Sequence, residues 1–147
     1  MDPLTAVLIG AAIPLLGFIV VHRLNLSRER KSRLASACAA FRAAITFAAS
    51  RVPEPEKHWE NLVLDGMPQI VANIGTAVVQ FKPFIQGKRR GEFEAEWLNL
   101  KAHIETQIPK ALSPAEIMYG GGAAMARESK KKFHERVNRL LEFANEA

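Results

Sequence analysis

Apolar residues recur along most of the chain with the period of an α-helix. After residue 33 one apolar face has spacings of four, three, four and three, and its members are Leu34, Cys38, Phe41, Ile45 and Ala48. No glycine or proline lies between Gly17 and Pro53, so a single helix can extend from the preceding segment to about Arg51. Pro53 and Pro55 are expected to end it.

Three later stretches show the same period. The stretch 68–81 carries its apolar stripe at Ile70, Val71, Ile74, Val78 and Phe81. The stretch 93–108 has the clearest stripe, at Phe93, Trp97, Leu100, Ile104 and Ile108, and Pro109 is expected to stop it. The last helix is predicted from about Ala123 to Asn145, with an apolar face of Met125, Phe133, Val137, Leu140, Leu141 and Ala144. Trp97 is expected at the centre of the resulting core, against Phe41, Phe81 and Val137.

Shorter elements connect these helices. A short helix is plausible over 56–64, and Ser113 to Glu116 form a capping box that predicts another through Met118. The segment 86–91, with Lys88, Arg89 and Arg90, is expected to be an exposed connector. No convincing strand and no internal repeat is found, so the predicted fold is all-α, a small bundle of three to five helices.

The first segment has a different character. Residues 3–21 contain no charged side chain, and a helix of that length just spans a hydrocarbon core of about 30 Å. Positive charge follows this run instead of preceding it, which is the reverse of a cleavable signal peptide. The sequence therefore predicts a transmembrane anchor at 1–22, a basic juxtamembrane segment at 23–33 and a cytoplasmic helical domain at 34–147.

Charge asymmetry sets the expected orientation. Before the run lies only Asp2, whereas the segment 23–33 has a net charge of +4 and its basic residues are Arg23, Arg28, Arg30, Lys31 and Arg33. Basic flanks stay in the cytoplasm and attract anionic lipid headgroups. The N-terminus is thus expected outside a bacterial inner membrane, with the lipid bilayer as a partner of the basic segment. Small residues in the span, Ala6, Gly10 and Gly17, leave open a homo-oligomer through this helix.

Composition limits the chemistry. The chain has 147 residues, a net charge of +5, one cysteine and four histidines. One cysteine excludes a disulfide framework, and no two histidines have the spacing of metal ligands on a helix. No catalytic residue, metal ligand or cofactor is predicted.

Two basic clusters remain as a tentative binding patch. Its members are Lys88, Arg89, Arg90, Lys130, Lys131 and Lys132. Anionic lipid, nucleic acid or an acidic protein are possible partners, and a solvated face balanced by nearby glutamates is the plainer interpretation. The positive charges of the last helix wrap around it, so no specific nucleic-acid binding is expected.

Residues 77–84 (AVVQFKPF), then Lys88 to Arg90 with Phe93 and Trp97, and residues 39–45 (AAFRAAI) resemble a pattern in small bacterial single-pass membrane-anchored proteins of unknown function. The resemblance implies a bacterial or phage origin and an N-terminal anchor, and it transfers no activity, ligand or site.

The function predicted is that of a membrane-anchored interaction or scaffolding protein with an unknown protein partner and no catalysis. The alternatives are a membrane-associated enzyme whose site only tertiary structure would reveal, and weak binding of a polyanion through the basic clusters.

Overall fold

The computed structural model describes residues 3–55, 65–111 and 122–145, with side chains from Val21 onward. The chain divides into two compact units, Met1–Ser36 and Ala37–Ala147, and each is described by itself. The short helices expected over 56–64 and 114–118 lie outside the described residues.

The first unit is entirely helical where it is described. It belongs to helix α1, which spans Pro3–Ala49, so the expected long helix ending near Arg51 is confirmed. Within the part of the chain that was described, no helix is both long and apolar enough to cross a membrane. The predicted span at 3–21 lies, apart from Val21, outside the residues whose side chains are described.

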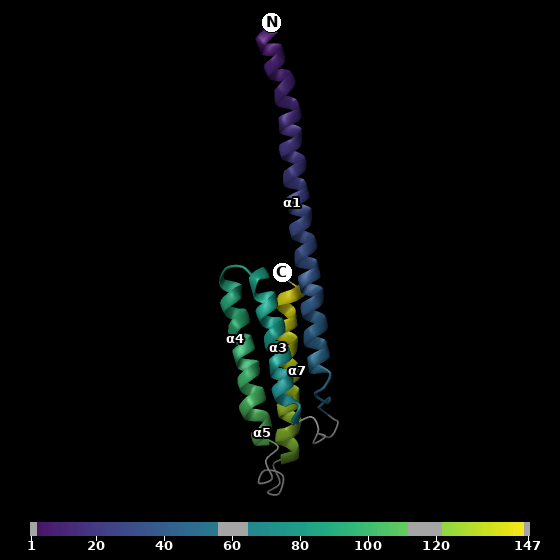
Figure 1. The fold of residues 1–147 in the computed structure, drawn as a ribbon. Coiled ribbons are helices and arrows are strands. Elements are labelled where there is room, and N and C mark those ends of the chain that lie inside the picture. The colour runs from purple at the N-terminus through teal and green to yellow at the C-terminus, as the bar shows by residue number, and fades with distance from the viewer. Residues whose placement is uncertain (1–2, 56–64, 112–121, 146–147) are drawn as a thin grey trace. The chain divides into compact units, whose positions relative to one another are not determined.

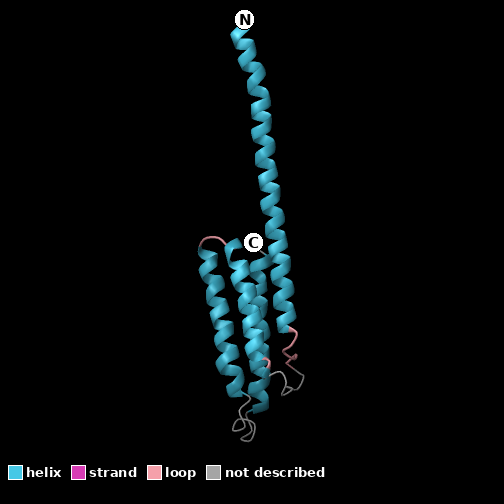
Figure 2. Cartoon of the chain, in the orientation of Figure 1, coloured by secondary structure: helices cyan, strands magenta, loops and turns pink. Residues whose placement is uncertain are grey.

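The second unit is a helical bundle. The end of α1 is followed by α3 (Met67–Phe81), a 3-10 turn η1 (Lys82–Phe84) and α4 (Lys88–Ala102). A π-helix η2 (His103–Gln107) then leads into α5 (Ile108–Ala111), and α7 (Gly122–Asn145) completes the bundle (Figure 1). Every regular element among the described residues is helical (Figure 2), which confirms the all-α prediction.

Phenylalanine rings from separate helices form the centre of the core. Phe41 of α1 stacks on Phe81 of α3 with ring centroids 4.5 Å apart, and Phe93 of α4 meets both rings edge-on at 5.7 and 5.9 Å. Phe143 of α7 approaches Phe93 at 5.3 Å. All but Phe143 are fully buried, so the predicted stripes of α1, α3 and α4 do converge.

Trp97 does not lie at the centre of the core, and that expectation was wrong. Its side chain is half-buried at the edge of the contact between α3 and α4. There it packs over Gly75, because a Cβ added to that glycine would lie 3.2 Å from Cζ2 of Trp97. The large ring fits against α3 only where the facing position has no side chain, while Phe93 and Leu100 on the same helix fill the core.

Helix α4 begins earlier and the chain stays helical later than expected. Gly87 takes a positive φ of 59°, and this turn starts α4 at Lys88, so Lys88, Arg89 and Arg90 form its first turn and not a loop. At the other end Pro109 does not stop the chain. Ile108 N–H donates to the carbonyl of His103, five residues back, and this wider turn precedes a proline ring that would crowd an ordinary helix.

The buried face of α7 is also shifted from the expected one. Met125 is exposed, whereas Ser129 and Lys130 are buried with Phe133, Val137 and Leu140. Seven residues make almost two helical turns, so position 126 and not 125 continues the line of Phe133. Two polar side chains, those of Ser129 and Lys130, therefore belong to the buried face in the N-terminal half of α7.

Candidate functional site

The five basic residues of the segment 23–33 are all exposed on α1. Arg23, Arg28, Arg30, Lys31 and Arg33 lie in a continuous exposed stretch, and Arg33 pairs with Glu29 one turn earlier. An exposed i,i+4 pair contributes little to stability. The stretch is therefore built as a charged surface and not as part of a packed core.

The structure separates the six residues of the predicted basic patch. Arg89 lies with its guanidinium 5.3 Å from the ring centroid of Phe143, and Arg90 Nε donates to the carbonyl of Ile85 at 3.1 Å. Lys88 is highly exposed, 3.9 Å from Glu92. These contacts give two of the three α4 residues local structural roles.

The α7 residues of the patch are divided in the same way. Lys130 is buried at 3% exposure, while Lys131 and Lys132 are exposed and lie 4.0 and 3.6 Å from Glu135 and Glu128. The lysine run therefore points in three directions around the helix, and it does not form one continuous cationic face.

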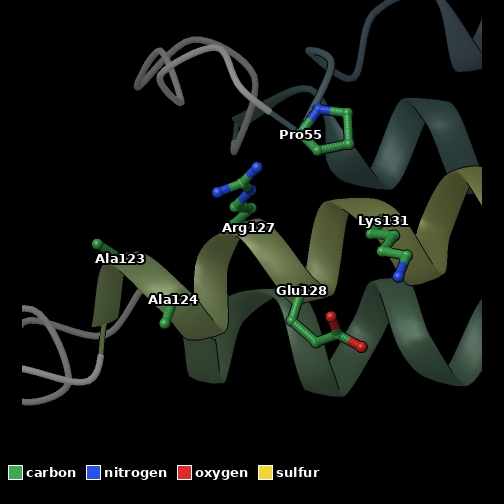
Figure 3. Close-up of a pocket in the computed structure, with 6 residues that line it drawn as sticks. All are labelled: Pro55, Ala123, Ala124, Arg127, Glu128 and Lys131. Carbon is green, nitrogen blue, oxygen red and sulfur yellow. The ribbon is translucent and has the colours of Figure 1, made fainter.

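The described structure has a hollow beside the N-terminal half of α7. It has a volume of about 750 Å³ and is lined by Pro55, Ala123, Ala124, Arg127, Glu128 and Lys131. Arg127 extends towards Pro55, while Glu128 leaves the opposite side of α7 (Figure 3). Its lining mixes both signs of charge with short apolar side chains.

A second hollow lies between α7 and the segment formed by η2 and α5. It has a volume of about 620 Å³, and its polar or charged lining residues are His103, Gln107, Lys110, Glu128, Ser129, Lys132 and Arg136. Its apolar lining consists of Ala111, Ala124 and Met125. Three cationic side chains face one carboxylate here, so this hollow carries a net positive charge.

His103 forms the buried polar floor of this second hollow. Its Nε2 lies 2.8 Å from the carbonyl oxygen of Ser129 and 3.3 Å from Ser129 Oγ. Because a carbonyl oxygen only accepts, Nε2 carries the hydrogen and donates it. The imidazole thereby links the π-helix to α7 through the interior.

The surroundings of His103 favour the neutral ring. Burial lowers the pKa of His103 below its ordinary value of 6.5, the hydrogen bond with Ser129 acts in the opposite direction, and the positive charges of Arg136 and Lys132 lower the pKa further. A neutral histidine can donate from one nitrogen and accept at the other, as a polar wall of a binding site does.

Among the described residues, no three histidine, cysteine or carboxylate side chains gather into a possible metal site. Cys38 is buried, as its place on the apolar face predicted. His134 lies with Nε2 3.3 Å from the carbonyl of Pro53, and His22 is exposed.

The sequence did not single out His103, Gln107 or Ser129 as neighbours. His103 directly precedes Ile104 in the apolar stripe, and Pro109 follows, which together were a signal of irregular helix beside a polar core position. Ser129 gave no such signal, because serine is common on solvated helices.

No protein-family model matches the chain, and neither a curated protein nor a solved structure matches it.

Proposed function

We propose that the protein is a single-pass membrane-anchored interaction protein without catalytic activity, and that its helical unit lies in the cytoplasm of a bacterial cell. The observation that carries the proposal is the uncharged run 3–21 followed directly by the basic segment 23–33. The exposed side chains of that segment on α1 suit anionic headgroups at the membrane surface.

The second unit supports a binding role more than a structural one. Val79 of α3 and Leu98 of α4 are 70% and 61% exposed, although both helices also carry a buried apolar face. Val79 lies between Gly75, which meets Trp97, and Lys82, which pairs with Glu94 at 2.6 Å. These two exposed apolar side chains, with the ion pair beside them, form the surface that we propose contacts the partner.

Membrane extraction tests the anchor. The full chain should stay with the membrane pellet after alkaline carbonate treatment, and Leu15→Arg should be released, since a charge near mid-span costs about 2.5–3.5 kcal/mol. Asn138→Arg is the matched control, because it adds the same charge to an exposed site of α7 outside the proposed contact surface and should remain in the pellet. Release of the unmodified chain would overturn the anchor.

Site-specific photocrosslinking in membranes tests the partner. A photoreactive amino acid at Leu98 should give an adduct of discrete mass, while the same residue at Asn138, which is exposed and polar on α7, should not. Adducts at both positions or at neither would contradict an interaction surface between α3 and α4.

A further inference from the structure

We propose that the hollow between the π-helix and α7 binds a small phosphate-bearing molecule with an apolar body. The inference is independent of membrane anchoring, because it rests on residues of the second unit alone. The site contains Lys110, Lys132 and Arg136 as cations, the buried pair of His103 and Ser129, and Met125 as an apolar side chain.

The positive charge of the residues that line the hollow favours an anionic ligand. Lys132 and Arg136 are one turn apart on α7, so they project from the same face, and Lys110 reaches the hollow from α5. Glu128 lies 3.6 Å from Lys132 and is the one carboxylate among the described lining residues, whose formal charges sum to +2. Arg136 offers the planar pair of donors that matches two phosphate oxygens.

The polar floor is held in place before any ligand arrives. His103 and Ser129 are about 95% buried, and their mutual hydrogen bond fixes the ring. Arg136 and Lys132 line the same hollow as this buried pair. Groups fixed in this way bind without the entropy cost of being ordered.

Size and apolar lining exclude a bare phosphate as the best ligand. The volume of about 620 Å³ falls within the range of roughly 300–1,000 Å³ usual for small-molecule sites. Met125, 38% exposed, has a flexible thioether that adapts to an aromatic or aliphatic group, and Ala111 and Ala124 also line the hollow. A phosphate monoester with an apolar body matches this mixture of cationic and apolar lining residues.

Phenyl phosphate is a suitable probe, and histidine NMR signals report on the site. The full chain, labelled with ¹³C-histidine and held in detergent micelles, has four histidines, and loss of one signal in His103→Gln assigns the reporter. Phenyl phosphate should shift the His103 signal saturably and leave the His22 and His134 signals in place. It should bind more tightly than phenol or inorganic phosphate, and equal binding by either would overturn the proposal.

Matched variants separate this site from general attraction to a basic protein. Arg136→Gln should weaken phenyl phosphate binding about tenfold, since one charge-assisted contact is lost. Lys131→Gln removes the same charge from the same helix but does not line this hollow, so it should change the affinity less than twofold. A His103 shift that does not saturate, or equal weakening in both variants, would show nonspecific attraction and reject the site.

Discussion

The ring of Trp97 lies over Gly75, close enough that a Cβ at that glycine would be 3.2 Å from Cζ2. This contact sets how closely α3 and α4 approach at their exposed edge. Gly75→Leu should therefore destabilise the protein by about 1–3 kcal/mol, as overpacked positions do. Chemical denaturation measures the change in the free energy of unfolding.

The double variant isolates the cause. In a Trp97→Ala background the same Gly75→Leu substitution should cost little or add stability, because leucine is the better helix former by nearly 1 kcal/mol. Equal destabilisation in both backgrounds would mean that the backbone at position 75 requires glycine, and that room for the Trp97 ring is not the reason.

Phe93, and not Trp97, should be the most sensitive aromatic position of α4. Phe93 is fully buried among Phe41, Phe81 and Phe143, so Phe93→Ala should cost about 3–5 kcal/mol. Trp97→Ala should lower the free energy of unfolding by clearly less, because Trp97 is only half-buried. Thermal or chemical denaturation of the two variants ranks them, and the reverse order would place the core on the other face of α4.

Periodicity predicted the helices well because burial of one apolar face is a local property of the sequence. It misplaced Trp97 because size and hydrophobicity do not reveal whether the facing helix has room, and only the absent side chain of Gly75 provides it. The prediction that Pro109 ends the helix failed for a different reason, since a π turn at His103–Gln107 lets the helix continue through the proline.

The candidate site was harder to foresee than the fold. The three lysines at 130–132 cannot be told apart from the sequence. In the structure Lys130 is buried, Lys131 faces Glu135 and Lys132 lines the hollow. The pairing of His103 with Ser129 joins residues 26 positions apart, and no spacing rule within one helix can predict it.

Stability should fall at mildly acidic pH because of His103. Its pKa is below 6.5 in the folded protein, so between that lower value and 6.5 the unfolded chain binds more protons. The contribution of His103 is therefore complete above about pH 6.5 and is lost as the pH falls through the folded pKa. Unfolding free energies measured from pH 7.5 to 5 should show this slope.

His103→Gln is the control for that slope, since its amide can still donate to the Ser129 carbonyl but does not titrate. The variant should lose part of the pH dependence in this window and keep the part due to other groups. An unchanged slope would show that His103 is not the titrating group.

Duplex DNA should bind only weakly. Lys130 is buried, Lys131 and Lys132 face glutamates, and Arg139 lies 3.7 Å from Glu96, so no continuous cationic face is available in the described part of α7. Titration of the full chain in micelles with a labelled duplex at near-physiological salt should give a dissociation constant no tighter than about 10⁻⁶ M. Submicromolar affinity would contradict this reading of the basic helix.

The orientation of the C-terminus tests the central claim most directly. Reporter fusions placed after residue 147 compare the two sides of the membrane in living bacteria. The charge of the segment 23–33 predicts a fluorescent protein fusion that glows and an alkaline phosphatase fusion that is inactive. Strong phosphatase activity would place the helical unit outside the cytoplasm and contradict the account.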